Sequence, residues 1–365
     1  MPPFTPCNGV EGHSVTTAGE QARALGSIPV RRGSLVQLIL LGVVFGAAAT
    51  VVALLVPWLP PVASKERDGI DLVFWFTTAI CIAIFSLVGS VIVYSVWKFR
   101  VRPDDDSDGP PIHGHTGIEI VWTAVPAILV TAISVMSGIV LVQNDRTGSN
   151  HLNVNVTARQ FQWTFSYPDQ KNLTSAQLRL PVGRSVELHL TANDVIHSFW
   201  VPEFGQKQDA LPGQDTKLVI TPTKVGTYPV ICTELCGLGH ALMRTSAIVM
   251  EPAAFAGWVK HQGEALNGPP GRAGKAVFDN NGCASCHTLK AAGATGKVGP
   301  DLDKLPAYAR QAGKPLEDFI KESIVDPNAY VQPGFPKGVM PPFALPDDQL
   351  NALVTFLIDS SKGVK

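Results

Sequence analysis

The chain has 365 residues, which is enough for two or three domains. Hydrophobic residues make up 45% of it and charged residues only 16%, a balance that favours a membrane protein over a purely soluble one. The formal net charge is -1 and no run of Lys and Arg is interleaved with aromatic residues, which argues against nucleic-acid binding.

The N-terminal segment is polar and glycine-rich without a hydrophobic period, so residues 1–34 are predicted to form a disordered tail. An uncharged apolar stretch follows at 35–58, and its length is roughly the twenty residues that a bilayer crossing needs. Small residues at 62–64 also permit a signal-peptide cut. Residues 35–64 are therefore either a signal peptide or a first transmembrane helix. The two arginines near the end of the tail place it in the cytoplasm.

Two more apolar runs, at 71–97 and 118–142, predict a transmembrane helical hairpin within residues 65–148. Basic residues, Lys98 and Arg100 among them, follow the first of these runs. By the positive-inside rule, the loop between the two runs is cytoplasmic. Everything after the second run is therefore expected on the extracytoplasmic side.

Three further segments follow the hairpin. Residues 149–252 contain short stretches of alternating polarity broken by Pro and Gly, which is typical of an antiparallel β-sandwich or barrel. Residues 253–271 begin with a helical pattern and end in the letters NGPPG, so we interpret them as a linker. Residues 272–365 form a last domain, which ends in a predicted helix at 346–360.

A cluster of metal-ligand residue types lies in the β-rich segment. Residues 232–243 read CTELCGLGHALM, and a further histidine lies upstream. This motif offers two thiolates, two imidazoles and a thioether, a soft set that favours copper; the residues are His197, Cys232, Cys236, His240 and Met243. A zinc site or a disulfide is the alternative. Zinc would be satisfied by two Cys and two His and would leave the thioether without a role.

The last domain carries a second motif. Cys283, Cys286 and His287 read CASCH, the pattern of covalent c-type haem attachment with an adjacent iron ligand. A thioredoxin-like or zinc-knuckle motif is the alternative. Met340 stands shortly before the terminal helix, where a sixth iron ligand would be expected, and it is the only Met of the domain. His and Met ligation would give a haem of raised potential, as a donor toward oxygen needs.

These two motifs together resemble subunit II of cytochrome c oxidase with a C-terminally fused c-type cytochrome domain, as in bacterial caa-type oxidases. The resemblance implies a multi-domain membrane protein with a transmembrane helical hairpin, a cupredoxin-like β-sandwich or barrel in 149–252, and an all-α class I cytochrome c domain in 272–365. It further implies that Cys232 and Cys236 bridge the two ions of a binuclear copper A centre. Each of the two histidines would ligate one copper, and Met243 would be a weak ligand.

The resemblance also assigns other residues. The carbonyl of Glu234 would be a copper ligand, and its side chain would reach a magnesium ion at the subunit I interface. Phe161 and Trp163 lie in the family's aromatic segment and are candidates for the electron path, although a β-strand with alternating core aromatics fits the pattern equally well. The usual electron-accepting Trp aligns with Phe161. Glu119 matches the family's second-helix signature at the cytoplasmic mouth of a proton channel, although a solvated headgroup-level Glu is the alternative.

The predicted function is therefore to pass electrons from cytochrome c or a cytochrome bc-type complex, through one covalent haem c and copper A, to subunit I. This would occur in a multi-pass protein of the bacterial cell membrane during proton-translocating aerobic respiration. A copper A-containing subunit of a nitric oxide reductase is the main alternative. A free-standing copper and haem shuttle, or a metallochaperone, is a third reading. The chain has no room for the propeller domain of nitrous oxide reductase.

Overall fold

The computed structural model describes residues 32–100 and 114–362. It contains three helices that are long and apolar enough to cross a membrane: α2 (Arg32–Leu55), α3 (Glu66–Lys98) and α4 (Thr116–Asn144). The predicted spans at 71–97 and 118–142 lie inside α3 and α4. The predicted tail lies outside the described residues except for 32–34. Most of the predicted basic loop also lies outside them.

The described chain divides into two compact units. The first comprises α2 and the part of α3 from Thr78 onward. Within it, the rings of Phe45 and Phe85 meet edge to face with centroids 5.9 Å apart. Small residues let these two helices approach closely, since a Cβ added at Gly46 would lie 3.2 Å from the Ser86 hydroxyl oxygen. The second unit holds residues 57–77 and everything from His115 onward.

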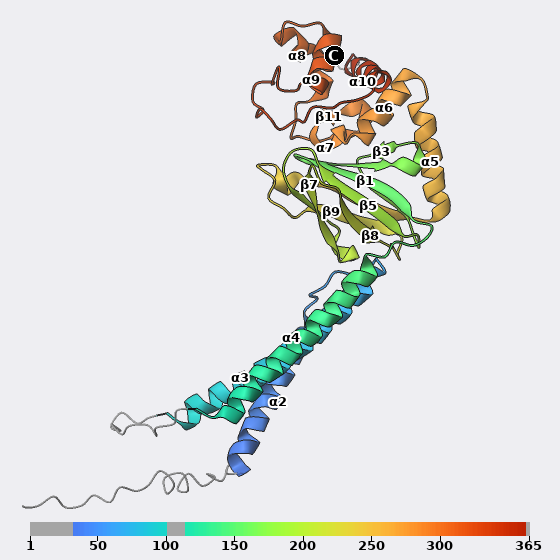
Figure 1. The fold of residues 1–365 in the computed structure, drawn as a ribbon. Coiled ribbons are helices and arrows are strands. Elements are labelled where there is room, and N and C mark those ends of the chain that lie inside the picture. Colours follow the sequence, from blue (N-terminus) through green and yellow to red (C-terminus); the bar gives the residue numbers. More distant parts are fainter. Residues whose placement is uncertain (1–31, 101–113, 363–365) are drawn as a thin grey trace, which may run out of the picture. The chain divides into compact units, whose positions relative to one another are not determined.

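The predicted β-domain is present as one continuous sheet that forms a cupredoxin-like barrel (Figure 1). Its strands pair along the path β3-β2-β1-β5-β7-β6-β9-β10-β4, and β8 pairs with β5. The strands are β1 (Leu152–Arg159), β2 (Gln162–Tyr167), β3 (Leu173–Ser175), β4 (Leu178–Pro181), β5 (Val186–Ala192), β6 (His197–Trp200), β7 (Lys207–Pro212), β8 (Thr216–Ile220), β9 (Gly226–Cys232) and β10 (Arg244–Met250).

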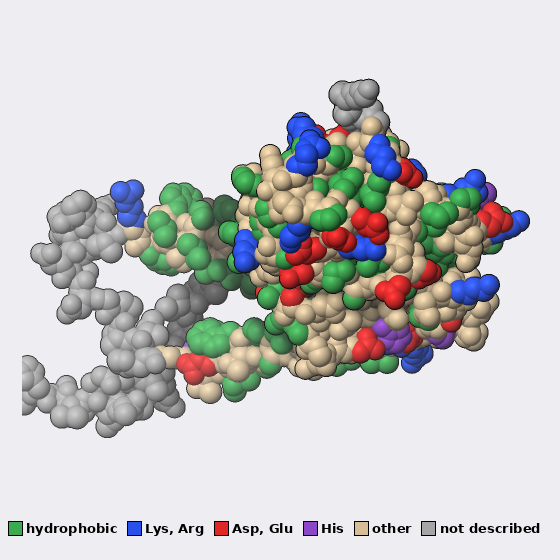
Figure 2. Space-filling view, turned by 90° about the horizontal axis from the view of Figure 1, so that it is seen from above, with side chains coloured by type: hydrophobic (Ala, Val, Ile, Leu, Met, Phe, Trp, Pro, Cys, Tyr) green, Lys and Arg blue, Asp and Glu red, His purple; other side chains and the backbone are tan. Residues whose placement is uncertain are grey.

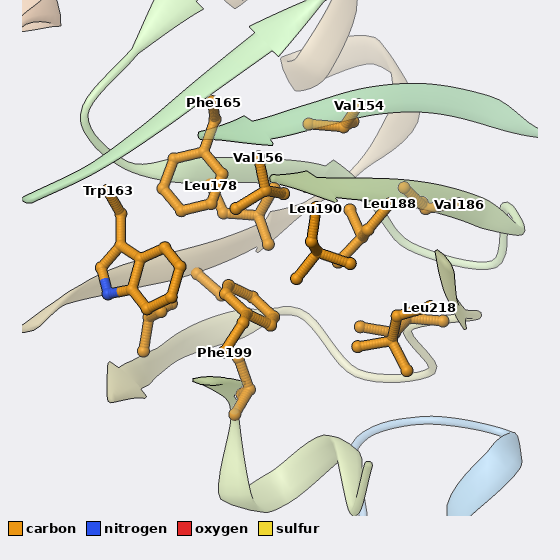
Figure 3. Packing of buried hydrophobic residues seen from close by; sticks show 14 of the residues in the cluster. Val154, Val156, Trp163, Phe165, Leu178, Val186, Leu188, Leu190, Phe199 and Leu218 are labelled. Atoms are coloured by element: carbon orange, nitrogen blue, oxygen red, sulfur yellow. The ribbon is translucent and has the colours of Figure 1, made fainter. Parts of the chain in front are cut away.

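Alternation of side chains builds the core of this barrel. In β5, Val186, Leu188 and Leu190 are fully buried, while the residues between them reach the outer face. Trp163 and Phe199 from β2 and β6 meet them in the interior, with ring centroids 5.5 Å apart (Figure 3). The predicted alternation therefore places every second side chain of the strand inside the barrel, where these side chains form the core.

The segment that precedes α3 is fixed to the barrel by buried polar contacts. The Ser64 hydroxyl donates to the carbonyl of Phe204 at 2.9 Å. The guanidinium of Arg67, almost fully buried, donates to the carbonyl of Pro202 at 2.8 Å and pairs with Asp71. A buried guanidinium needs such partners to offset its loss of water. The start of α3 is thus joined to the barrel by more than the peptide chain.

Helix α5 (Pro252–Leu266) occupies most of the segment that the sequence presents as a linker. Its Phe255 is buried, and its Trp258 lies edge-on to Tyr167 of the barrel with centroids 5.2 Å apart. The guanidinium of Arg179 lies 5.3 Å from the Trp258 ring centroid. The helix therefore belongs to the barrel's core, and only residues 267–269 connect it to the next helix.

The last domain is largely helical, as predicted, and has its own hydrophobic core. Its helices are α6 (Pro270–Asn280), α7 (Cys283–Cys286), α8 (Leu305–Gln311), α9 (Leu316–Val325) and α10 (Asp347–Ser361), with a short hairpin of β11 (Thr288–Leu289) and β12 (Ala294–Thr295). Helices α6 and α10 cross closely at Gly274. A Cβ there would lie 2.5 Å from that of Phe356, so no larger residue fits without movement.

The surface differs between the globular part and the long helices. Figure 2 shows Lys and Arg interspersed with Asp and Glu over the globular face in view, and mainly hydrophobic side chains along the helical segments. Many large apolar side chains of α2, α3 and α4 are exposed in the chain by itself. Such apolar helical surface is what lipid or other membrane-embedded subunits would cover.

Candidate metal centre and haem site

Two neighbouring strands bring the candidate copper ligands together. His197 opens β6 and Cys232 closes β9, and these strands pair antiparallel with Phe199 opposite Cys232. The loop after Cys232 returns through a short 3-10 turn and joins β10 just after Met243. The backbone N–H of Cys232 donates to the carbonyl of Met243 at 3.3 Å, which closes the loop at its base.

The donor atoms of all five predicted side chains converge at this end of the barrel. The ligand atoms of His197, Cys232 and Cys236 lie within 4.8 Å of one another. The two Sγ atoms are 4.0 Å apart. Cys236 Sγ lies 3.5 Å from His240 Nδ1 and 3.8 Å from Met243 Sδ. The sequence motif therefore becomes a single cluster in space.

Asp194 orients one of the two imidazoles. Its carboxylate contacts Nε2 of His197 at 2.8 Å, while Nδ1 of the same ring faces Cys232 Sγ at 3.9 Å. The carboxylate also accepts backbone N–H groups of Gln160 and Val195, each at 2.7 Å. A carboxylate bonded in this way fixes the ring of a metal-ligating histidine and leaves the other nitrogen for the metal.

The two thiols of the cluster differ in acidity. Burial raises the pKa of Cys232, but hydrogen bonds from His197 and from the backbone of Ser198 and Glu234 outweigh it and lower the pKa to about 7. Burial and the adjacent Cys232 thiolate raise the pKa of Cys236 to about 12. Loading a metal on both sulfurs must therefore displace a proton from Cys236.

The chemistry of this donor set fits copper. Two thiolates, two imidazoles and a thioether are soft ligands, and Met243 is fully buried with its sulfur turned toward Cys236. Zinc sites with two Cys and two His do not use a thioether. The carbonyl of Glu234 accepts from Cys232 Sγ at 3.3 Å, so it lies at the cluster, while the rest of Glu234 is exposed.

The aromatic segment lies against the same cluster. The Trp163 ring is buried and meets His197 with ring centroids 6.2 Å apart. Phe161 packs on the loop that carries the thiols, and a Cβ added at Gly239 would overlap its ring. Trp163 is therefore a core residue of a β-strand, as one of the two interpretations holds, and its role in an electron path stays a prediction.

The candidate haem ligands lie on α7 and the residue after it. Nδ1 of His287 lies 2.8 Å from the carbonyl of Pro300, an acceptor that leaves Nε2 for iron. Burial lowers the pKa of His287, so the ring is a neutral imidazole, the form that binds metals. Cys283 and Cys286 are the first and last residues of α7, so they lie about one helical turn apart. The residues present therefore fit a covalently attached haem.

Met340 is half-buried on the loop between α9 and α10. Hydrogen bonds on either side of Met340 hold this loop: Gly338 N–H donates to the side chain of Asn328 at 2.9 Å, and Phe343 N–H donates to the carbonyl of Ile324 at 2.9 Å. None of the contacts of the described residues tests the predicted role of Met340 as an iron ligand. Its ligand role remains a prediction.

Glu119 lies in the first turn of α4. Its carboxylate accepts the backbone N–H of His115 at 3.0 Å, and the His115 ring accepts the N–H of Ile118 at 3.3 Å. This reciprocal arrangement caps the helix. The position is thus compatible with a structural role as well as with the predicted proton path.

Sequence reasoning missed three residues that the structure places beside the sites. Asp194 contacts His197, the side chain of Gln160 donates to the carbonyl of Cys236, and Arg159 donates to the carbonyl of Pro342 at 2.6 Å. Asp194 is three residues before His197, so its spacing offered a signal. Gln160 and Arg159 contact residues that are far away in the sequence, so no local pattern indicated these contacts.

Comparison with known proteins agrees with this arrangement. Three family models match: the cytochrome c oxidase subunit II transmembrane domain over residues 50–139, its periplasmic domain over 174–252, and cytochrome c over 271–361. Two relatives named cytochrome c oxidase subunit 2 come from Synechocystis sp. and Thermostichus vulcanus. The first is 33% identical and the match covers 55% of this chain and 74% of the relative; the second is 34% identical, with 58% and 80% covered.

A third relative of the same name, from Alkalihalophilus pseudofirmus, is 29% identical, and the match covers 76% of this chain and 84% of the relative.

Proposed function

The chain belongs to the cytochrome c oxidase subunit 2 family, and from this premise we propose that electrons enter the oxidase through it. It is subunit II of a haem-copper oxidase, a membrane protein that carries a C-terminal cytochrome c domain and works with the other oxidase subunits. In our proposal it takes electrons from cytochrome c or a cytochrome bc-type complex and delivers them, by way of its own haem c and copper A, to subunit I.

The proposed copper A centre is held by the cluster at the end of the barrel. Its two coppers would be held by the thiolates of Cys232 and Cys236 and the imidazoles of His197 and His240, and Met243 and the Glu234 carbonyl would complete the set. A copper pair bridged by thiolates would share one electron with little change in bond lengths. The observation that carries the proposal is the convergence of five soft donors on one buried site.

In the proposal, Cys283 and Cys286 would attach the haem covalently, and His287 and Met340 would ligate its iron. The chain's own residues supply the orientation, since the Pro300 carbonyl fixes the His287 ring. Tethering the haem-holding domain to the copper-holding domain gives it a high effective concentration there, so transfer need not await a diffusional encounter. Phe161 and Trp163 are the proposed aromatic contacts along the path, which the edge-on approach of Trp163 to His197 supports.

In the membrane part, we propose that Glu119 stands at the cytoplasmic mouth of a proton channel of subunit I. Near the copper cluster, we propose that the exposed Glu234 side chain reaches a magnesium ion at the interface with subunit I. The barrel and the cytochrome domain would face the extracytoplasmic side of a bacterial cell membrane. The proposed division is 1–34 tail, 35–64 signal peptide or first span, 65–148 hairpin, 149–252 copper domain, 253–271 linker and 272–365 cytochrome domain.

Spectroscopy and metal analysis of the purified oxidase test the proposal. We expect two coppers per chain, a mixed-valence two-copper electron-spin signal and a low-spin His/Met haem spectrum. Met243→Leu keeps the volume but removes the thioether, so it should alter the copper signal. Met250→Leu in β10 is the matched control and should not. Zinc, or a single copper with Met243 intact, would refute the copper assignment.

The nitric oxide reductase alternative makes a different prediction. The purified complex would then consume nitric oxide faster than oxygen when it is given a cytochrome c donor. A complex that reduces oxygen and acidifies the outer side of vesicles supports the oxidase. The same assay on Glu119→Gln, compared with the wild type, reports on the proposed proton path.

A further inference from the structure

A two-residue turn joins β1 and β2, and this hairpin contacts both the candidate copper site and the cytochrome domain. Arg159 closes β1 and Gln162 opens β2, and the two are paired directly across the hairpin. Paired residues of antiparallel strands project from the same face of a sheet. Gln160 and Phe161 form the turn itself. The paired residues Arg159 and Gln162 can therefore contact one neighbour while the turn residues Gln160 and Phe161 contact another.

The turn residues contact the loop that carries the copper-site thiols. The side chain of Gln160 donates to the carbonyl of Cys236, and its backbone N–H donates to Asp194 at 2.7 Å. The Phe161 ring fills the space beside Gly237 and Gly239, where an added Cβ would meet it at 3.3 Å or closer. The turn is thus packed against the copper side.

The two flanking residues instead contact the cytochrome domain. Arg159 donates to the carbonyl of Pro342 at 2.6 Å, and its guanidinium lies 5.2 Å from the ring centroid of Phe343. The side chain of Gln162 donates to the carbonyl of Asn281. Pro342 is two residues after Met340, and Asn281 is two residues before Cys283. The contacted segments are therefore the two that would hold the haem.

The Arg159 contact is more than a solvated surface pair. Its guanidinium is half-buried, and the charge of Asp194 acts on it. Withdrawal of a guanidinium from water costs free energy unless other groups compensate. The Pro342 carbonyl, the Phe343 ring and the Asp194 charge offset part of that cost, although the buried Nε of Arg159 has no hydrogen-bond partner among the described residues. Because Asp194 also contacts His197, the same carboxylate connects the docking residue to a candidate copper ligand.

We propose that Arg159 and Gln162 are positioning residues that dock the two haem-holding segments of the cytochrome domain onto the β1–β2 hairpin. The hairpin thereby fixes the separation of the haem-holding and copper-holding segments. This inference deepens the proposed function and rests on it for its purpose. The docking itself involves only side chains and backbone of the chain, so it can be measured independently of either bound group.

The experiment compares two variants with two matched controls in the whole oxidase. Arg159→Ala removes the charged contact, and Gln162→Glu keeps the shape but turns the donor into an acceptor that faces a carbonyl. Arg184→Ala and Gln206→Glu are the controls, because both side chains donate to backbone carbonyls within the barrel. Hydrogen exchange of residues 338–345 reports the Arg159 contact, and exchange of residues 279–287 reports the Gln162 contact. Pulsed electron-spin measurement reports the distance distribution between the copper pair and the haem.

We expect exchange to rise about tenfold in 338–345 for Arg159→Ala and in 279–287 for Gln162→Glu, the equilibrium change that a hydrogen bond from a charged or buried donor typically carries. The distance distribution should broaden, and both controls should match the wild type. Exchange and distances unchanged in both variants would overturn the docking role. Absence of the two-copper and haem signals from the wild-type complex would instead refute the proposed function. The exchange data would still show whether the two domains are docked.

Discussion

Asp194 belongs to no sequence motif, yet its carboxylate holds a residue of the candidate copper site in place. It accepts two backbone N–H groups and contacts His197 Nε2. Burial raises the pKa of Asp194, but these hydrogen bonds and the charge of His197 outweigh it and lower the pKa below its usual value. The carboxylate is therefore ionised at neutral pH, and an ionised partner favours one orientation of the His197 ring.

Asp194→Asn should weaken copper binding by ~10–100-fold, the typical cost of losing such a supporting carboxylate. Asn keeps the size but loses the charge that favours the bound ring orientation. Competition with a copper chelator measures the affinity. Asp215→Asn is the control, because Asp215 contacts Nδ1 of His189 at 3.0 Å outside the copper cluster. Equal affinity in the two variants would show that the carboxylate has no orienting effect.

At the scale of elements, the cytochrome domain depends on one helix crossing. Helices α6 and α10 meet at Gly274, where the backbone of Ala352 lies against the missing side chain. Val277 and Phe278 of α6 and Leu353 of α10 are buried around the crossing. The absence of a Cβ at this point lets these apolar residues interlock.

Gly274→Ala should destabilise the cytochrome domain by about 1–3 kcal/mol, as overfilling of a packed interface usually does. The helix-propensity gain of Ala, about 1 kcal/mol, opposes but does not cancel the overlap. Urea unfolding followed by haem absorbance measures the difference. Gly271→Ala is the control, because it lies in the same helix with open space at its Cβ and should be neutral or stabilising. If Gly274→Ala unfolds at the same urea concentration as the wild type, α10 can move away from the added methyl group without loss of stability.

At the scale of the whole molecule, the soluble part has two separate hydrophobic cores. One lies inside the barrel and includes both copper-site thiols and Met243. The other lies among the helices of the cytochrome domain. Domains with separate cores can unfold separately, and a metal bound to one stabilises that one directly.

Removal of copper with a chelator should therefore lower the unfolding temperature of the barrel and leave that of the cytochrome domain nearly unchanged. At a free copper concentration a hundredfold above the dissociation constant, the lost stabilisation would be about 2.7 kcal/mol. Differential scanning calorimetry with haem absorbance separates the two transitions. A Cys232→Ser, Cys236→Ser protein should not respond to the chelator. Transitions that shift together would show that docking couples the two domains.

The sequence predicted those parts that depend on local patterns. Alternation of polarity predicted the strand at Val186, and the spacings of Cys232 and Cys283 predicted the two candidate sites. It could not predict contacts between distant segments, such as the one from Arg159 to Pro342, because nothing local to either residue marks the partner. Helix α5 was predicted only in part. Its helical pattern could be recognised in the sequence, but its packing against Tyr167 could not.

The packing of α5 on Tyr167 determines where the chain can be cut to isolate the barrel that holds the candidate copper site. The Tyr167 hydroxyl is fully buried and exchanges hydrogen bonds with the backbone of Arg179, and Phe255 and Trp258 cover its ring. A soluble fragment truncated at Met250 would leave this aromatic surface open to water and prone to self-association. The smallest fragment that keeps its own interior closed therefore extends to Leu266, and proteases should cleave preferentially at 267–269.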